Sequence, residues 1–228
     1  MSIKSYLSLF ILCTLVACKD SKPEQTAEVQ PEDSNKETLV DNDHISLAVI
    51  PAKTVIKWSA SKPGKTHSGR IRVKEGNVRV STRKVIDADM VIDMSTIRVE
   101  DLEGDSKEKL ERHLMGLDAV RADDFFNIRK YPFSEFSLNK VVSLLNDDNY
   151  KHLVYGDLRM RDVTKEIAFR ANIEFTDGGL TVMSEEFSIN RTEWGIKFMS
   201  KNFFDDLKDN FIQDEVKLRI ELEAGSNF

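Results

Sequence analysis

The chain has 228 residues, of which 40% are hydrophobic and 32% are charged, and its formal net charge is −6 at pH 7. This length and apolar content are sufficient for one large domain or two small ones with a substantial core. The four histidines never occur at metal-ligand spacing and no Gly-x-Ser-x-Gly motif is present, so we expect no metal site and no enzyme activity.

Residues 1–17 have the layout of a secretory signal peptide. Lys4 is followed by an apolar run that closes with the small residue Ala17, and the run is too short to span a membrane. Residues 15–18 read Leu-Val-Ala-Cys, which resembles the bacterial lipobox. We therefore predict that Cys18 is acylated and anchors the mature protein to a membrane. The alternative is an ordinary signal peptide followed by a chance cysteine.

Residues 18–43 should form the acylated cysteine and a flexible acidic tether. Positions 19–43 hold eight acidic and three basic side chains and almost no large apolar ones, so they cannot bury enough surface to fold. Residues 44–228 are then nearly neutral, without the basic footprint of a nucleic-acid-binding protein. Lys19 is not the aspartate that some Gram-negative bacteria use for inner-membrane retention. We therefore expect an outer-membrane anchor with the protein facing the periplasm.

The two cysteines leave no free thiol in the predicted mature fold. Cys13 is removed with the signal peptide and Cys18 is consumed by acylation. Cysteine catalysis, disulfides and cysteine-ligated zinc are therefore excluded.

From residue 53 onward the dominant hydrophobic period is two, which is typical of half-buried antiparallel strands. In residues 166–175 one face consists of Ile167, Phe169, Ala171, Ile173 and Phe175. Residues 215–223 alternate in the same way. Turn signals separate the predicted strands at Pro63-Gly64, Gly76-Asn77, residues 146–149 and residues 177–179. Many strands in series indicate a sandwich or a closed barrel.

One segment has a helical pattern. In Ser106 to Gly116, Leu110 and Leu114 share a face, and the glycine is a plausible terminator. The segment from Asp123 to Phe136 follows, and it is unusually rich in aromatic residues. The fold class is therefore all-β, an antiparallel domain with a short helical insertion.

In its motifs the sequence resembles the YceI-like family, whose members have a lipocalin-like antiparallel barrel. The matching pieces, in the family's order, are Ile56-Lys57-Trp58, His67-Ser68-Gly69, residues 93–97, His113-Leu114, residues 124–127, residues 130–132, residues 156–158, residues 163–165, Asn190-Arg191 and residues 194–196. Between His113-Leu114 and Asp124-Phe125 this chain carries the extra residues Met115 to Asp123, which should alter the mouth of the barrel.

The resemblance implies an envelope protein that binds or carries a long-chain lipid, a polyisoprenoid or a fatty-acid derivative, inside residues 44–228. No other cofactor is expected. The residues expected to contact the lipid are Trp58, Met90, Ile92, Leu114, Phe125, Phe126, Met160, Phe169, Ala171, Arg191 and Trp194. Phe125 and Phe126 would plug the interior, and Pro132 would start the next strand. His67 would lie at the rim of the barrel.

The sequence is compatible with several alternatives. The aromatic and methionine side chains either line a lumen or fill a solid core, and Arg191 with Trp194 forms either a ligand-contacting wall or a packing corner. A packed barrel would make the protein an interaction module of the envelope, and a small enzyme acting on an isoprenoid is a third hypothesis. Pairing of the barrel with itself as a homodimer is also left open.

Overall fold

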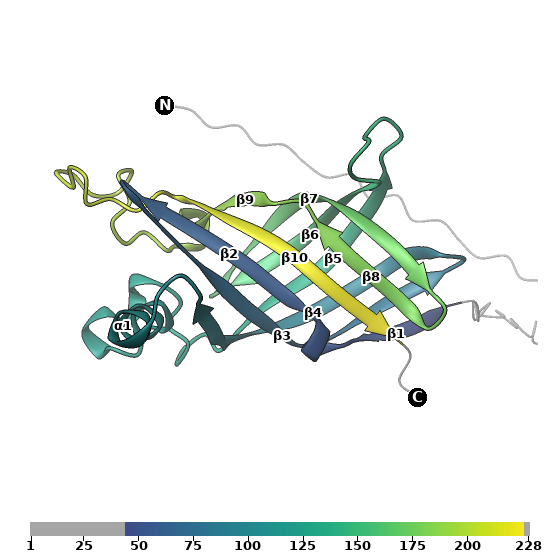
Figure 1. Ribbon diagram of the computed structural model, residues 1–228, viewed down its shortest axis with the longest axis horizontal. Coiled ribbons are helices and arrows are strands. Elements are labelled where there is room, and N and C mark those ends of the chain that lie inside the picture. Colours follow the sequence, from purple (N-terminus) through teal and green to yellow (C-terminus); the bar gives the residue numbers. More distant parts are fainter. Residues whose placement is uncertain (1–43, 226–228) are drawn as a thin grey trace, which may run out of the picture. The chain divides into compact units, whose positions relative to one another are not determined.

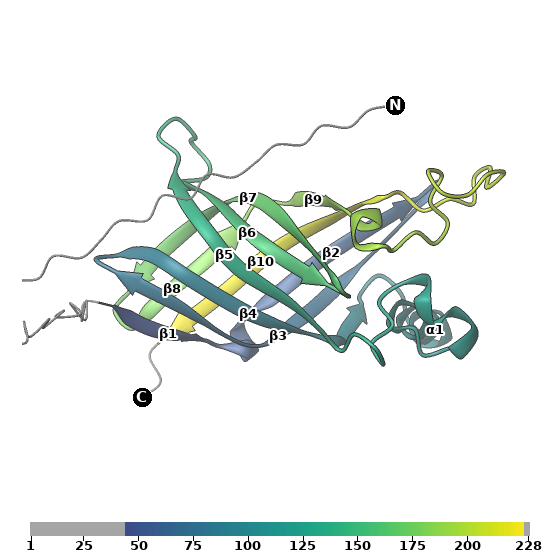
Figure 2. The same cartoon turned by 180° about the vertical axis from the view of Figure 1, so that it is seen from behind.

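The computed structural model describes residues 44–225, in which ten antiparallel strands form one sheet that curls into a near-closed barrel (Figures 1 and 2). The strands are β1 (Ile45–Val49), β2 (Val55–Lys62), β3 (Lys65–Ser81), β4 (Lys84–Val99), β5 (Phe133–Ser143), β6 (His152–Met160), β7 (Val163–Thr176), β8 (Gly179–Ser184), β9 (Phe187–Asn190) and β10 (Glu215–Gly225). The helices are η1 (Pro51–Lys53), α1 (Gly104–Met115), η2 (Ala119–Asp124) and η3 (Arg191–Trp194). The predicted signal peptide, Cys18 and the tether lie outside the described residues.

The sheet closes because its last strand pairs on both sides. The strand order is β1-β10-β2-β3-β4-β5-β6-β7-β8, and β10 also pairs with β8, where Leu222 lies opposite Val182. β1 pairs with both β10 and β3, whereas β9 pairs with β10 alone. The predicted antiparallel barrel with a short helical insertion is confirmed.

The period-two pattern places the apolar side chains inside the barrel. In β7, Phe169 and Ala171 are buried while Ala168 and Arg170 are exposed. The same alternation in β2 buries Ile56 and Trp58. Because successive side chains of a strand point to opposite faces, each strand contributes one row to the interior.

One predicted turn is wrong. Gly76-Asn77 lies inside β3, beside a register shift in the ladder with β4. A Cβ atom on Gly76 would lie 2.4 Å from the carbonyl oxygen of Asp89, so the close approach of β4 requires this glycine. The hairpin turns at Thr82-Arg83, where both φ angles are positive without a glycine. The other predicted turns lie between strands, at Pro63-Gly64, residues 146–149 and residues 177–178.

The predicted helix is confirmed as α1, which begins two residues earlier than expected. Gly116 ends the helix in the left-handed conformation, with φ 67°, and its N–H faces the last helical carbonyls. Leu110 and Leu114 pack against the core cluster. Figures 1 and 2 show α1 and the segment between η3 and β10 at the same end of the barrel. No helix of residues 44–225 has the length and apolar character needed to cross a membrane.

Candidate ligand-binding site

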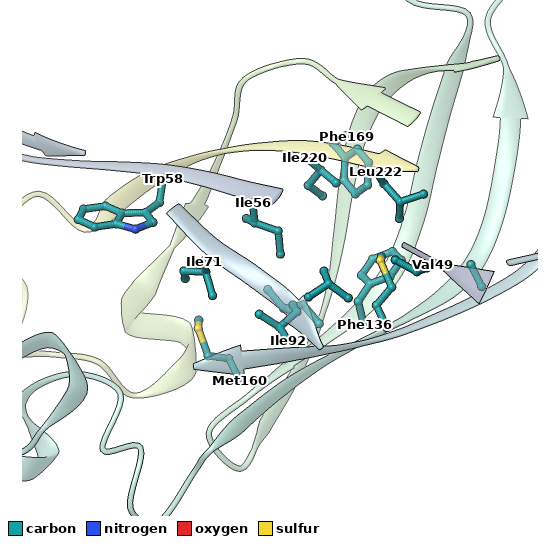
Figure 3. Close-up of a cluster of buried hydrophobic side chains, with 14 of the residues drawn as sticks. Val49, Ile56, Trp58, Ile71, Ile92, Phe136, Met160, Phe169, Ile220 and Leu222 are labelled. Atoms are coloured by element: carbon teal, nitrogen blue, oxygen red, sulfur yellow. The ribbon is translucent and has the colours of Figure 1, made fainter. Parts of the chain in front are cut away.

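An apolar cavity of about 130 Å³ occupies the half of the barrel next to α1. The strands contribute Ile56, Trp58, Ala60, Ile71, Met90, Ile92, Met94, Phe136, Leu158, Met160, Ile167, Ile189 and Leu218, among others. Leu114 comes from α1, Phe125 and Phe126 come from the segment after it, and Ile196 and Ile212 come from the connection between η3 and β10. Figure 3 shows several of these side chains projecting from different strands toward a common interior.

Eight of the predicted contact residues line this cavity. They are Trp58, Met90, Ile92, Leu114, Phe125, Phe126, Met160 and Arg191. The first residues of the aromatic-rich segment after α1 therefore point into the barrel: Phe125 is buried and Phe126 is partly buried. β5 begins at Phe133, directly after Pro132, whose carbonyl oxygen accepts a hydrogen bond from the Met94 amide at 3.0 Å.

Phe169, Ala171 and Trp194 lie outside the cavity lining. The Phe169 ring stacks on Phe187 with centroids 4.8 Å apart, and Ala171 is 0% exposed, so both belong to the packed half of the barrel. On β7 only Ile167 reaches the cavity. The alternation therefore correctly predicts which face of β7 points into the barrel. The cavity extends along only part of that face.

Trp194 belongs to a packing corner together with Arg191. The Trp194 indole N–H donates to the Leu158 carbonyl oxygen at 3.0 Å. The guanidinium of Arg191, which is 4% exposed, lies 3.2 Å from Asp214. It also donates to the carbonyl oxygens of Ile196, Ile212 and Gln213. Burial lowers the pKa of Arg191, and the Asp214 carboxylate opposes that shift. The corner ties η3 to the segment that leads into β10.

Two residues of the lining each hold one buried polar atom that lacks a partner. Neither Trp58 Nε1 nor Ser134 Oγ has a hydrogen-bond partner among the described residues, although the two side chains are 9% and 3% exposed. A buried polar group that lacks a partner costs about 1–3 kcal/mol. Neither atom contributes to the surface of the cavity, which is wholly apolar.

Two histidines near α1 are each bonded to an aspartate. His113 Nε2 lies 2.8 Å from Asp124 Oδ2, and its ring makes an edge contact with Phe125 at 5.0 Å. His67 Nδ1 lies 2.8 Å from Asp101 Oδ2. Burial alone would raise the pKa of Asp101, but hydrogen bonds from the Ser68 amide and from His67 outweigh it and lower the pKa. As predicted, His67 is a rim residue.

Within residues 44–225, no group of three or more His, Cys, Asp or Glu side chains could hold a metal ion. No hydroxyl of this region bonds to either histidine, so the histidine–aspartate pairs have no attached serine or threonine nucleophile.

The geometry defines a class of protein, the antiparallel barrel with an internal apolar cavity and one helical insertion. The family model described as the YceI-like domain matches residues 47–224, and the chain belongs to this family. The comparison with curated proteins finds no match.

Two solved structures are similar in fold. BcnA from Burkholderia cenocepacia has 17% sequence identity and a TM-score of 0.57, with 77% of this chain and 99% of that chain covered. A polyisoprenoid binding domain from Saccharophagus degradans, implicated in plant cell wall breakdown, has 14% identity and a TM-score of 0.55, with 79% and 98% covered. At these identities the likeness concerns the fold alone.

Proposed function

We propose that the protein is an envelope lipoprotein that binds or carries a long-chain lipid, a polyisoprenoid or a fatty-acid derivative, inside its barrel. The observation that carries this proposal is the apolar cavity, which is enclosed by strands, by α1 and by two connecting segments. Family membership and the polyisoprenoid binding domain with a similar fold support the choice of ligand class.

The size of the cavity indicates how a lipid would fit. Engineered apolar cavities of about 150 Å³ bind benzene, so a volume of about 130 Å³ accepts a short apolar segment directly. A longer tail requires the lining to move. Met90, Met94 and Met160 lie in that lining, and the unbranched methionine side chain adapts readily to a new shape.

The expected affinity comes mainly from the tail. Each buried methylene contributes about 0.8 kcal/mol before ordering costs, and an apolar wall discriminates poorly between tails of similar width.

Organic extraction of the purified protein, followed by mass spectrometry, tests the proposal. A carrier should release a long-chain compound in a stoichiometric amount. A barrel that releases none, and that takes up no added prenol or fatty acid, would be an envelope interaction module with a packed interior.

The membrane anchor is part of the same proposal and depends on the sequence at residues 15–18. Acylation of Cys18 would hold the protein at the outer membrane on the periplasmic side, where residues 19–43 would act as a tether. Cell fractionation and labelling with a fatty acid test this part separately from lipid binding.

A further inference from the structure

The segment between η3 and β10, residues 195–214, has no regular secondary structure and projects from the barrel at the end that holds α1 (Figures 1 and 2). It exposes two phenyl rings, because Phe203 and Phe204 are each 48% exposed. Among the exposed large apolar side chains of residues 44–225, these two alone are adjacent in sequence. Single exposed apolar residues are ordinary on a protein surface, whereas a group of them marks an interaction site.

The base of this segment is fixed to the barrel. The Asp214 carboxylate accepts a hydrogen bond from the Ser200 hydroxyl at 2.8 Å. The amide of Gln213 donates to the carbonyl oxygen of Ser61, near the end of β2, at 2.8 Å. The hydrogen bonds of residues 203–210 remain within the segment itself. The two rings are therefore carried on a tip that projects from a firmly attached base.

The backbone of the segment is strained. Met199, Asp206 and Lys208 have φ angles of 52°, 59° and 49°. They are three of the seven non-glycine residues with positive φ in residues 44–225. The left-handed conformation is unfavourable for residues other than glycine, and such strain is concentrated at functional sites. The strain is a second indication that the segment does more than connect η3 to β10.

The same segment contributes to the wall of the apolar cavity. Ile196 and Ile212, near its two ends, line the cavity. The Phe198 ring makes edge contacts with Phe125 of the cavity wall at 5.5 Å and with His113 at 5.2 Å. A surface that binds the exposed tip is therefore brought next to the wall of the cavity.

The charges of the tip are balanced, and its lysines lie beside aromatic rings. Residues 197–210 carry three lysines and three aspartates. The Lys197 ammonium lies 4.4 Å from the ring centroid of Phe203, and that of Lys201 lies 3.7 Å from the ring centroid of Phe211. Neither lysine has an ion pair in the described part of the chain. This arrangement suits the interface of a bilayer, where rings enter the acyl region while ammonium groups stay among the phosphates.

The exposed apolar area is too small for a stable protein partner. An aromatic side chain has about 150–250 Å² of surface, and about half of each ring is exposed, so Phe203 and Phe204 together present roughly 150–240 Å². A stable protein–protein interface buries about 800 Å² on each partner. A fluid bilayer requires no matching surface of that size.

A bilayer is also the surface that stays within reach of the barrel. Cys18, the predicted anchor, precedes the first described residue, His44, by 26 positions. At about 3.3–3.6 Å per residue, a fully extended chain of this length spans roughly 90 Å. The barrel would therefore remain near the membrane, and a high effective concentration makes even a weak contact sufficient for docking.

We infer that residues 201–210 dock the barrel on a lipid bilayer, with Phe203 and Phe204 inserted into its interfacial region. This inference rests on the proposed membrane anchor and lipid ligand, and it names the surface of the barrel that meets the membrane. Because the charges of the tip balance, docking depends on the two phenyl rings and takes place on a zwitterionic membrane.

The test places a tryptophan reporter at the tip of the full-length protein. Phe203→Trp and Leu145→Trp are compared on excess vesicles of phosphatidylcholine with brominated acyl chains, which quench tryptophan fluorescence on contact. Leu145 is 91% exposed and lies in the connection between β5 and β6, away from α1 (Figures 1 and 2). Wild type is measured in parallel, because Trp58 lines the cavity and reports brominated lipid bound there.

Phe203→Trp should be quenched, whereas Leu145→Trp should show no quenching beyond that of wild type. Adding Phe204→Ser to Phe203→Trp should shift the docking equilibrium about threefold to tenfold toward the undocked state, since about half of one phenyl side chain leaves the bilayer. Val142→Ser is the matched control, because Val142 is 43% exposed on β5 and does not belong to the tip. It should leave the quenching unchanged. Thermal midpoints of all variants check that they fold.

Two results would overturn the inference. If the protein sediments with the vesicles but the two reporters are quenched equally, or neither is quenched beyond wild type, the tip does not dock and the anchor stands. If the protein does not sediment with the vesicles, the inference and the proposed anchor fail together. Quenching in wild type concerns the cavity alone, so the proposed lipid binding is judged separately.

Discussion

The boundary between the cavity and the packed half of the barrel can be tested with three alanines. Ala60 lines the cavity, Ala171 is fully buried in the packed half, and Ala168 is exposed on the outside of β7. The same change, alanine to phenylalanine, is made at each position. The added phenyl ring enters the cavity at position 60, the packed core at position 171 and the outer surface at position 168.

At Ala60 the added ring should compete with the lipid. It is the size of benzene, and cavities of about 150 Å³ bind benzene, so it would fill most of the 130 Å³ present. At ~30 Å³ per water-sized group, that volume holds about four methylenes of a tail. Their displacement at about 0.8 kcal/mol each should weaken binding by about 3 kcal/mol, roughly a hundredfold, with little change in stability.

At Ala171 the ring has no space to enter. Overpacking of a filled core costs about 1–3 kcal/mol, which lowers the thermal midpoint of a domain of this size by about 2–12 °C. Ala168→Phe controls for added surface hydrophobicity and should change neither property. Asn172 is a poorer control, because its side chain bonds to the backbone of Asn149 and Lys151.

The assay measures bound lipid per mole by mass spectrometry and the thermal midpoint of each variant. Wild-type lipid content in a folded Ala60→Phe protein would refute the assignment of this wall to the ligand. Loss of lipid from Ala171→Phe without loss of stability would show that the lumen extends into the half described as packed.

Further predictions concern the anchor, the tether, the buried corner and the rim. Cys18→Ala should abolish labelling by fatty acid and leave unprocessed precursor, whereas unchanged labelling would contradict the lipobox interpretation. Deletion of residues 19–43 should leave the thermal midpoint unchanged, and a drop of many degrees would mean that they pack on the barrel. Arg191→Met should cost about 3–5 kcal/mol in chemical denaturation, because it removes the cationic partner of the largely buried Asp214 carboxylate, to which only the neutral donors Ser200 and Asn202 then remain among the described residues. Asp101 has a lowered pKa in the folded state, so its stabilising contribution is present above its unfolded pKa and is lost as the pH falls through the folded value. The difference in thermal midpoint between wild type and Asp101→Asn should therefore be present at pH 6 and close below about pH 4, and a constant difference would contradict this reasoning.

The inward face of each strand was predictable from the sequence because side chains alternate across a sheet. How far the cavity extends along the barrel was not predictable from the sequence. Phe169 and Ile167 are on the same face of β7, but Phe187 stacks on Phe169 and closes that part of the barrel. The stacking partner comes from β9, and alternation within one strand carries no information about which distant ring will cover it.

A polar crevice beside α1, lined by Lys65, Lys109, Arg112 and Arg121 among others, was also hidden in the sequence. Lys65 is far along the chain from Lys109 and Arg121, and each of these side chains alone is typical of a solvated surface. Only the packing of α1 beside the start of β3 brings them together. The extra residues Met115 to Asp123 signalled a change at the mouth of the barrel, and this segment supplies Arg121 and Asp118 to the crevice.

The closure of the sheet has a consequence for the solution behaviour of the protein. A strand at an open edge presents unpaired N–H and C=O groups that can recruit a second chain and start aggregation. In residues 44–225 every strand except β9 has a neighbour on both sides along at least part of its length, and β9 is four residues long. If the protein is anchored as proposed, copies on one membrane would meet often, and the backbone open to sheet extension is then limited to stretches such as residues 138–143 of β5, which pair with β6 alone.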